Sequence, residues 1–374
     1  MATIARTILR RKVRETMNKE KYYSSKKLRK VDCDYYIIIG QKSNGKSFDI
    51  KSLLLKEALE DGRRFAYMRR WAHDRTANKV EKYFGDEGLF TVNDFKPYTE
   101  VQCYTDNIYL GTRDDKGKQT KDLLVGYSVA LSSEAHHASL AYPDVYNILF
   151  EEFITDSGYF GTEEVSIFNR LCSTVLRRRP GTKIYMIGNT INRFCPYFSE
   201  FNININDIKK GEITYITYDD TENSKQIKIG IEYCEDVYTN PLVFGKSAKM
   251  INGGEWQVAK VPLVRRDTRA DRLLFKFYVQ KEYSIYKCLV LYAEDDRQPY
   301  IFVYPYTTPD KITDKDRLFT DSHEMQTRLH NTNLTLSLSC DIMLTELFKL
   351  NRICYSDSLT GTEFEIIRNE RGWR

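Results

Sequence analysis

The sequence predicts an α/β fold in which a P-loop nucleotide-binding domain is followed by a small α+β module. Three observations predict it. An unbroken apolar run, residues 35–39, leads into the pattern G-x-x-x-x-G-K-S and then into a helical stretch. A second, largely apolar stretch, residues 146–150, is followed by two acids, and from Asn202 onward the chain becomes rich in alternating, strand-like segments. We therefore expect a P-loop domain over residues 1–205, a linker over 206–255 and a C-terminal domain over 256–374.

The composition is that of an ordinary globular chain. With 374 residues, 41% of them hydrophobic and 29% charged, it is long enough for two domains. No apolar run approaches the roughly 20 residues of a membrane span, so no membrane role is expected. The eight cysteines form no C-x-x-C pair, which predicts reduced cytosolic thiols, and the first 17 residues lack the apolar core of a signal peptide.

Charge is concentrated at the N-terminus. The formal net charge of +5 is small for this length, but residues 1–30 carry eleven Lys or Arg against two acids. This basic segment either binds a polyanion or forms a solvated, frayed helix.

The glycine-rich pattern predicts a phosphate-binding loop. Gly40 and Gly45 can take positive φ, so that backbone N–H groups turn toward phosphates at the N-terminus of the following helix. Lys46 is expected to bridge the terminal phosphates and the Ser47 hydroxyl to ligate Mg²⁺. A turn without a ligand is the alternative. The loop residues expected to bind nucleotide are Gly40, Gln41, Lys42, Ser43, Asn44, Gly45, Lys46 and Ser47.

The two acids that end the 146–150 strand predict hydrolysis and not binding alone. Glu151 is expected beside Mg²⁺, and its length also allows a contact through water. Glu152 is expected to orient or deprotonate the water that attacks the γ-phosphate. A chance pair of charges at a strand end is the alternative.

Further candidates lie downstream. A helix predicted over residues 162–178 ends in three arginines, and the strand after it ends at Asn189, which is expected beside the γ-phosphate as a sensor. Arg177 to Arg179 are candidates for an arginine finger, which contributes about 10³–10⁵ in rate. A solvated helix C-terminus is the alternative.

Two basic regions are candidates for nucleic-acid contacts. A strand over residues 63–71 brings Arg69 and Arg70 to the edge of the sheet, where Arg69 approaches nucleotide or DNA or forms a structural salt bridge. A hairpin with strands at 108–111 and 123–127 carries a basic tip that either touches phosphates without reading sequence or is merely solvated. The possible DNA contacts at this tip are Arg113, Lys116, Lys118 and Lys121.

The C-terminal residues predict an α+β module. Its expected strands and helices are residues 273–279, 286–292, 300–304, 321–331 and 341–351. Its basic residues, either nucleic-acid contacts or plain surface, are Arg265, Arg266, Arg269 and Arg272.

Together these motifs resemble the genome-packaging ATPases of small, short-tailed, protein-primed phages of the phi29-like group. The resemblance covers most of residues 30–205. It rests on the P-loop, on residues 67–70, 130–133 and 142–143, on the acids within residues 150–154, and on Gly188-Asn189 followed by residues 196–198 and 201–202.

The resemblance implies a RecA-like ASCE domain that hydrolyses ATP with Mg²⁺. It implies a pentameric ring on the portal of an empty procapsid that drives double-stranded DNA through its centre, in part of the group with a packaging RNA. Such a protein acts in the host cytoplasm, transiently at the portal vertex, and is absent from the mature virion.

The resemblance also assigns residues. By alignment the trans-acting arginine of the family corresponds to Arg177, with Arg179 as second choice. The family has another basic residue that acts across subunits; this chain has Ala138 at that position, beside His136 and His137. The C-terminal domain resembles a vestigial RNase H-like nuclease, because the expected first strand, residues 273–279, lacks the acids that two metal ions need.

Other functions share parts of this pattern. A HerA/FtsK-like helicase or DNA translocase would use the same ATP chemistry. A P-loop small-molecule kinase or a GTP switch is the other class, but the nearest match to the guanine motif N-K-x-D, residues 78–81, lies upstream of the acids and ends in Glu.

Overall fold

The computed structural model divides the chain into two compact units. The residues it describes are 22–85, 87–114, 116–137, 140–155, 160, 163–177, 179–220, 225–235, 256, 261–263, 270–294, 298–313, 315–322, 325–326 and 338–373. The first unit comprises Met1–Thr155, Tyr159–Thr190 and Ile208–Glu255, and the second comprises Asp156–Gly158, Ile191–Asp207 and Trp256–Arg374.

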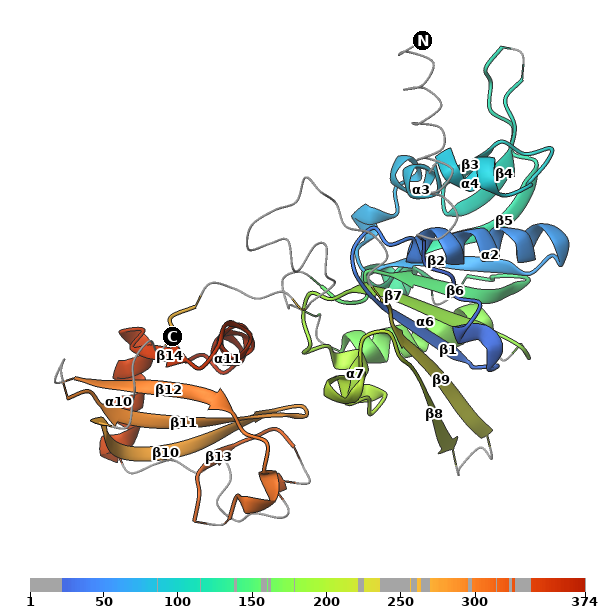
Figure 1. Cartoon of the computed structure of the whole chain (residues 1–374). Coiled ribbons are helices and arrows are strands. Elements are labelled where there is room, and N and C mark those ends of the chain that lie inside the picture. Colours follow the sequence, from blue (N-terminus) through green and yellow to red (C-terminus); the bar gives the residue numbers. More distant parts are fainter. Residues whose placement is uncertain are drawn as a thin grey trace, which may run out of the picture. The chain divides into compact units, whose positions relative to one another are not determined.

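A nine-stranded sheet forms the centre of the first unit (Figure 1). Its six inner strands run parallel, in the order β5-β2-β6-β7-β1-β9, and antiparallel strands flank them on both sides. In sheet order the strands are β3 (Glu100–Tyr104), β4 (Asn107–Gly111), β5 (Leu123–Ala130), β2 (Arg64–Arg69), β6 (Val145–Glu151), β7 (Lys183–Asn189), β1 (Tyr35–Gly40), β9 (Lys225–Tyr233) and β8 (Ile213–Asp220).

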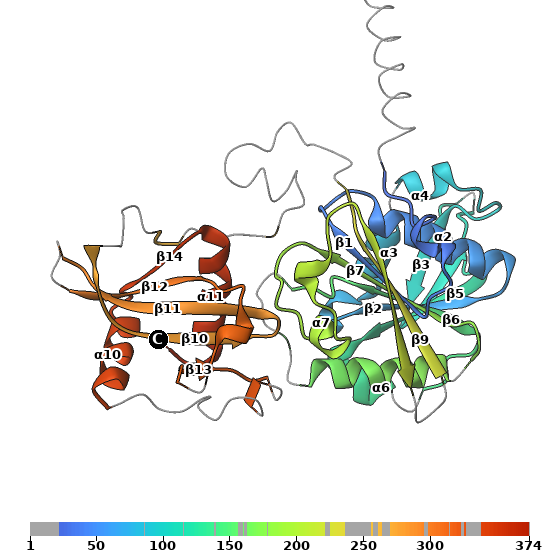
Figure 2. The ribbon, with the colours of Figure 1, turned by 60° about the horizontal axis from the view of Figure 1, so that its bottom comes forward.

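Helices cover both faces of this sheet. Helix α2 (Lys46–Glu60) lies on one face and α6 (Glu164–Leu176) on the other, as Figure 1 and Figure 2 show. Successive residues of a strand point to opposite faces, so a strand buried on both is apolar throughout. In β6, Leu149 joins the core under α2, whereas the Phe150 ring stacks on Phe168 of α6 with centroids 5.5 Å apart. The predicted strand, loop and helix around the P-loop are thus confirmed.

Shorter elements surround the sheet. The predicted hairpin is confirmed, since β4 and β5 pair antiparallel on either side of residues 112–122. The remaining helical segments of this unit are η1 (Leu28–Lys30), η2 (Ala72–Asp74), α3 (Ala77–Phe84), α4 (Glu87–Val92), η3 (Leu131–Ser133) and α5 (Glu134–His137).

The expected linker over residues 206–255 is wrong for its first half. Residues 213–220 form β8 and residues 225–233 form β9, and β9 pairs in parallel with the P-loop strand β1, Ile37 opposite Ile231. Ile229 and Ile231 are buried there, so this segment extends the sheet instead of leaving it. The expected boundary at 205 is also wrong, because Ile191–Asp207 belongs to the second unit. Residues 236–255 lie outside the described residues.

The second unit contains a five-stranded mixed sheet in the order β13-β10-β11-β12-β14. The predicted strands are confirmed as an antiparallel meander, β10 (Arg272–Lys281), β11 (Ser284–Tyr292) and β12 (Pro299–Pro305), with β13 (Leu318–Phe319) and β14 (Ile353–Tyr355) parallel at its sides. Its helical segments are α7 (Pro196–Glu200), η4 (Ile205–Asp207), η6 (Pro309–Lys311), α10 (Leu338–Lys349) and α11 (Ser358–Glu370).

The helix expected at 341–351 is confirmed as α10, whereas the one expected at 321–331 falls largely outside the described residues. Residues 1–21 of the basic N-terminal segment, and Arg265, Arg266 and Arg269, are outside them as well. In the described part of the chain no helix has the length and apolarity that crossing a membrane requires.

Candidate nucleotide site

The P-loop joins β1 to α2 and closes around the ammonium group of Lys46. Gly45 precedes the helix with φ of 96°, and Gly40 has φ of 154°, so the loop uses backbone that other residues rarely adopt. Lys46 is buried. Its Nζ donates to the carbonyl oxygens of Gln41 at 2.5 Å and Gly40 at 3.2 Å, and to Oδ1 of Asn44 at 3.1 Å.

Burial lowers the pKa of Lys46 to about 8. Removal from water disfavours the ammonium ion, and neutral carbonyl groups offset this only in part. An anionic ligand in the loop supplies the missing opposite charge. The geometry of the loop therefore suits a phosphate.

Three strand ends bring the candidate residues together. Gly40 at the end of β1 lies opposite Asn189 at the end of β7, and Glu151 at the end of β6 lies opposite Ile187 of β7. Asn189 Oδ1 is 3.5 Å from Lys46 Nζ. The parallel strands thus place Asn189 between the P-loop and the paired acids.

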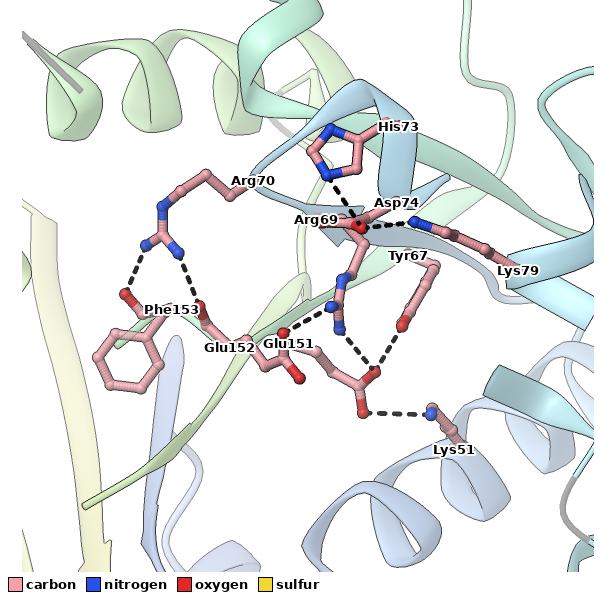
Figure 3. A network of polar contacts seen from close by, with 10 residues as sticks. All are labelled: Lys51, Tyr67, Arg69, Arg70, His73, Asp74, Lys79, Glu151, Glu152 and Phe153. Carbon is pink, nitrogen blue, oxygen red and sulfur yellow. Dashed lines mark hydrogen bonds and ion pairs between the residues drawn. The ribbon is translucent and has the colours of Figure 1, made fainter. Parts of the chain in front are cut away.

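Glu151 is buried among positive and hydroxyl groups (Figure 3). Its carboxylate lies 3.2 Å from Lys51 Nζ and 3.7 Å from Arg69 Nη1, and accepts a 2.5 Å hydrogen bond from the Tyr67 hydroxyl. Burial alone would raise its pKa, but the contacts with Lys51, Ser47, Tyr67 and Arg69 hold the pKa below its usual value. The carboxylate is therefore ionised beside the Ser47 hydroxyl, a donor pair that fits Mg²⁺.

Glu152 contacts the same arginine as Glu151 but is much more exposed. It has φ of 58°, its side chain is 64% exposed, and Arg69 Nη2 donates to its Oε2 at 2.6 Å (Figure 3). Arg69 therefore forms the structural salt bridge that was one of the expected alternatives, and it pairs with both acids of the site. Glu152 is within reach of solvent beside the P-loop edge, where a general base is needed.

Sequence reasoning missed Lys51 and Tyr67. Lys51 lies on α2 with its Nζ also bonded to the Tyr83 carbonyl at 2.9 Å, and Tyr67 lies on β2. The one signal in the sequence is that Lys51 lies three and four residues before Leu54 and Leu55, on the same apolar face of the helix, where the structure shows it buried. Nothing in the neighbourhood of Tyr67 distinguishes it from a core aromatic residue.

The N-terminal residues and β9 complete the rim of the P-loop. Tyr23 N donates to the Asn44 carbonyl at 2.9 Å, and its hydroxyl donates to Glu232 of β9 at 2.8 Å. Tyr22 is 64% exposed, and a methyl group on Gly45 would lie 3.2 Å from its Cβ. Sequence reasoning missed Glu232 because it placed β9 in a linker.

The arginines after α6 lie away from this site. Arg179 donates to the carbonyl oxygens of Tyr142, Val145, Val175 and Leu176 at 2.8–3.2 Å. Arg177 is exposed, has φ of 46°, and donates from Nη2 to the Leu140 carbonyl at 2.9 Å. Both are near the starts of β6 and β7, at the sheet edge opposite the P-loop. Arg178 and Ala138 lie outside the described residues.

The hairpin candidates are all exposed. Arg113 pairs with Glu100 at 2.9 Å, and Lys121 Nζ lies 3.5 Å from the centroid of the Tyr104 ring. Lys116 and Lys118 donate their backbone N–H groups to Asp114. The Arg113 and Lys121 side chains thus contact residues of β3, and all four side chains are open to solvent.

In the described residues, no group of three or more His, Cys, Asp or Glu side chains is arranged to hold a metal ion. At the P-loop, the candidate metal donors are the Ser47 hydroxyl and the Glu151 carboxylate, and the phosphate oxygens of a nucleotide would complete such a site.

The fold and this arrangement define a P-loop nucleotide-binding protein of the α/β class. Residues 17–256 match the family described as Podovirus DNA encapsidation protein (Gp16), and the chain belongs to this family. The resemblance to phi29-like packaging ATPases is thereby confirmed.

Individual relatives agree with the family match. The chain is 30% identical over 206 residues to the DNA packaging proteins of Bacillus phage phi29 and Bacillus phage PZA, covering 54% of this chain and 56% of each relative. It thus spans little more than half the length of these relatives. The solved structure of the bacteriophage Phi-29 viral genome packaging motor assembly is similar in fold, at 21% identity and a TM-score of 0.53, with 94% of this chain and 99% of that chain covered.

Proposed function

We propose that this protein is the ATP-hydrolysing subunit of a motor that moves double-stranded DNA into a preformed procapsid through its portal. One observation carries the proposal within this family: Glu151 ends β6 and Glu152 directly follows it, with the sensor candidate Asn189 between these acids and the P-loop. The strand β7 inserted between β1 and β6 supports a RecA-like ASCE domain.

Each residue of the site has a role in this chemistry. The P-loop N–H groups and Lys46 would bind the β- and γ-phosphates. Ser47 and Glu151 would hold Mg²⁺, which would supply positive charge to offset that of the phosphates. Glu152 accepts the proton of the attacking water or orients it, and the Asn189 amide contacts the γ-phosphate or this water.

Arg177 serves a neighbouring subunit. It follows the 13-residue α6 at the starting edge of the sheet, and the strands β6 and β7, seven residues each, span about 20 Å from there to the P-loop edge. One arginine side chain cannot cover that length, so Arg177 cannot reach its own nucleotide. Arg179 is held by four carbonyl groups of its own subunit, which favours Arg177 over Arg179.

The proposed assembly follows from the action of Arg177 on the nucleotide of a neighbouring subunit. A closed homo-oligomeric ring, a pentamer in our proposal, gives every site an arginine from its neighbour. DNA contacts are assigned to Arg113, Lys116, Lys118 and Lys121, with the portal, and a packaging RNA where one is used, as further partners. The protein acts in the host cytoplasm, transiently at the portal vertex, and leaves before the virion matures.

The second unit is proposed to be a vestigial nuclease-like domain without cleavage activity. Its first strand, β10, contains no Asp or Glu over Arg272–Lys281, and the preceding Asp271 accepts hydrogen bonds from the Tyr300 hydroxyl at 2.6 Å and the Glu294 N–H at 3.3 Å. Two-metal cleavage requires clustered carboxylates. The domain is left to bind DNA or the portal.

ATP hydrolysis by the purified protein, with and without double-stranded DNA, tests the proposal. Lys46→Ala and Glu152→Gln are expected to abolish hydrolysis, and Arg177→Ala to abolish it in homogeneous assemblies only. Mixing Arg177→Ala with Glu152→Gln subunits should restore activity, because an intact site then meets an intact arginine. Full hydrolysis by Glu152→Gln would refute the assignment of the base. Filling of procapsids separates this function from a HerA/FtsK-like translocase or helicase.

A further inference from the structure

The buried Arg70 donates hydrogen bonds to two successive backbone carbonyl groups, those of Glu152 and Phe153. Arg70 Nη1 donates to the Glu152 carbonyl at 2.9 Å, and Nη2 donates to the Phe153 carbonyl at 2.7 Å (Figure 3). Arg70 comes from the end of β2, directly after Arg69, whose guanidinium binds the Glu152 carboxylate. Neighbouring arginines thus hold the same glutamate by its backbone and by its side chain.

The same guanidinium is tied to α6. Its Nε lies 3.0 and 3.1 Å from the two carboxylate oxygens of Glu164, and its Nη2 lies 2.9 Å from Oε1. Arg70 and Glu164 are both more than 90% buried. A planar guanidinium can serve three acceptors in fixed directions, which a lysine ammonium on its flexible stem does not reproduce.

This contact constrains a strained backbone. Glu152 is in the left-handed region with φ of 58°. For a residue with a side chain, this conformation raises the free energy of the folded state by about 1–2 kcal/mol. It persists only where the surroundings hold it. The two carbonyl contacts of Arg70, and the hydrogen bond from Glu152 N to the Ile187 carbonyl at 2.9 Å, supply that hold.

Glu164 lies at the first residue of α6, and Arg177 follows its last residue. A 13-residue helix is about 20 Å long and moves as one body on this scale. The stacked rings of Phe168 and Phe150 pack its middle against β6. The buried Arg70–Glu164 ion pair is thus a polar link between the Glu152 segment and this helix, beside the ring contact.

We infer that the Arg70–Glu164 pair couples Glu152 of one subunit to Arg177, which the same subunit offers to its neighbour. Arg70 is a positioning residue for Glu152, and α6 transmits the state of one site to the next. The inference rests on the proposed trans role of Arg177. It goes beyond that role, because it names the contact through which neighbouring sites are coordinated.

The first test concerns the subunit that contains the pair. Arg70→Lys keeps the charge beside Glu164 but loses the shared carbonyl contacts, so kcat is expected to fall by about 10²-fold, the cost of a misplaced catalytic group. KM for ATP should change little because the P-loop is untouched. Unchanged kcat, or a loss explained by equal loss of folded protein in a thermal melt, would overturn the positioning role.

The second test isolates the coupling. Glu152→Gln subunits cannot hydrolyse ATP but donate Arg177 to Arg177→Ala subunits, whose own sites are intact. Adding Glu164→Gln to the donors is expected to lower the restored rate about tenfold, within the usual range of coupling between sites. The donors' own chemistry is already absent, so only the arginine they present can change.

A matched control is Arg170→Gln in the donors. Arg170 is on the same helix, and its pair with Glu134, 3.2 Å long and half exposed, does not touch the Glu152 segment. This change should leave the restored rate as it was. If the donor Glu164→Gln does not fold, donor Arg70→Lys replaces it.

Two results overturn the coupling alone: no effect of the donor change, or an equal effect of Arg170→Gln. Absence of any restored activity in the parent mixture overturns the trans role of Arg177 and this inference with it. The two failures are therefore distinguishable.

Discussion

Replacing Arg177 with glycine should separate its catalytic role from its structural one. Arg177 ends α6 in the left-handed conformation, with φ of 46° and ψ of 47°. Glycine is the usual residue at this position after a helix, because it lacks the Cβ that makes the conformation costly. An arginine here is unfavourable for folding, so its presence calls for another reason.

The expected magnitudes follow from the contacts. Glycine relieves about 1–2 kcal/mol of backbone strain. Loss of the exposed hydrogen bond to the Leu140 carbonyl, 2.9 Å long, costs about 0.5–1.5 kcal/mol. The difference places Arg177→Gly between about 0.5 kcal/mol less stable and about 1.5 kcal/mol more stable than the native protein, so little net change is expected. Arg179→Ala loses bonds to four carbonyl groups and should be about 3 kcal/mol less stable.

Urea denaturation and ATP turnover of the same preparations measure both effects. Arg177→Gly should retain its unfolding midpoint while hydrolysis falls about 10³-fold. Arg179→Ala should unfold at lower urea. Native turnover by Arg177→Gly would refute its role as the finger, and a midpoint well below that of the native protein would refute the strain calculation.

Three further predictions concern the nucleotide site. Because burial lowers the pKa of Lys46 to about 8, ATP binding at pH 8 should take up about half a proton, measured by calorimetry in buffers of different ionisation heat. Lys51→Met removes the largest favourable contact of the Glu151 carboxylate and raises its pKa, so the acid limb of the pH–rate profile should move to higher pH. Gly188→Ala places a methyl group 2.8 Å from the Phe153 ring and should lower the free energy of unfolding by about 1–3 kcal/mol in urea titrations.

Each of these has a contradicting result. Lys46→Arg stays protonated and is the control for proton uptake, so equal uptake by that variant would contradict the source of the proton. An unshifted acid limb in Lys51→Met would remove Glu151 from the essential ionisations. A native urea midpoint for Gly188→Ala would mean that the contact with Phe153 relaxes without cost.

The local parts of the site could be predicted from the sequence. Each part of the site lies at the carboxyl end of a short apolar strand: the P-loop at β1, the paired acids at β6 and Asn189 at β7. Parallel strands bring these ends to one edge of the sheet. That edge is where Lys46 and Asn189 meet at 3.5 Å. Predicting that these residues lie together therefore required only the local sequence around each strand and this rule about parallel strands.

The contacts that support the site could not be predicted, because their partners are far apart in the chain. Arg70 and Glu164 are 94 residues apart, and Tyr67 and Glu151 are 84 apart. Strand β8 was missed for another reason. Its residues are partly or fully exposed where their burial is described, so its alternating polar residues looked like a connecting segment.

The central claim is that hydrolysis at Glu152 drives DNA into a capsid. Procapsids incubated with the native protein, ATP and phage DNA should come to protect full-length DNA from added nuclease. With Glu152→Gln, which should still bind ATP, protected DNA should be absent. Protection at the native level by the Glu152→Gln protein would contradict the claim.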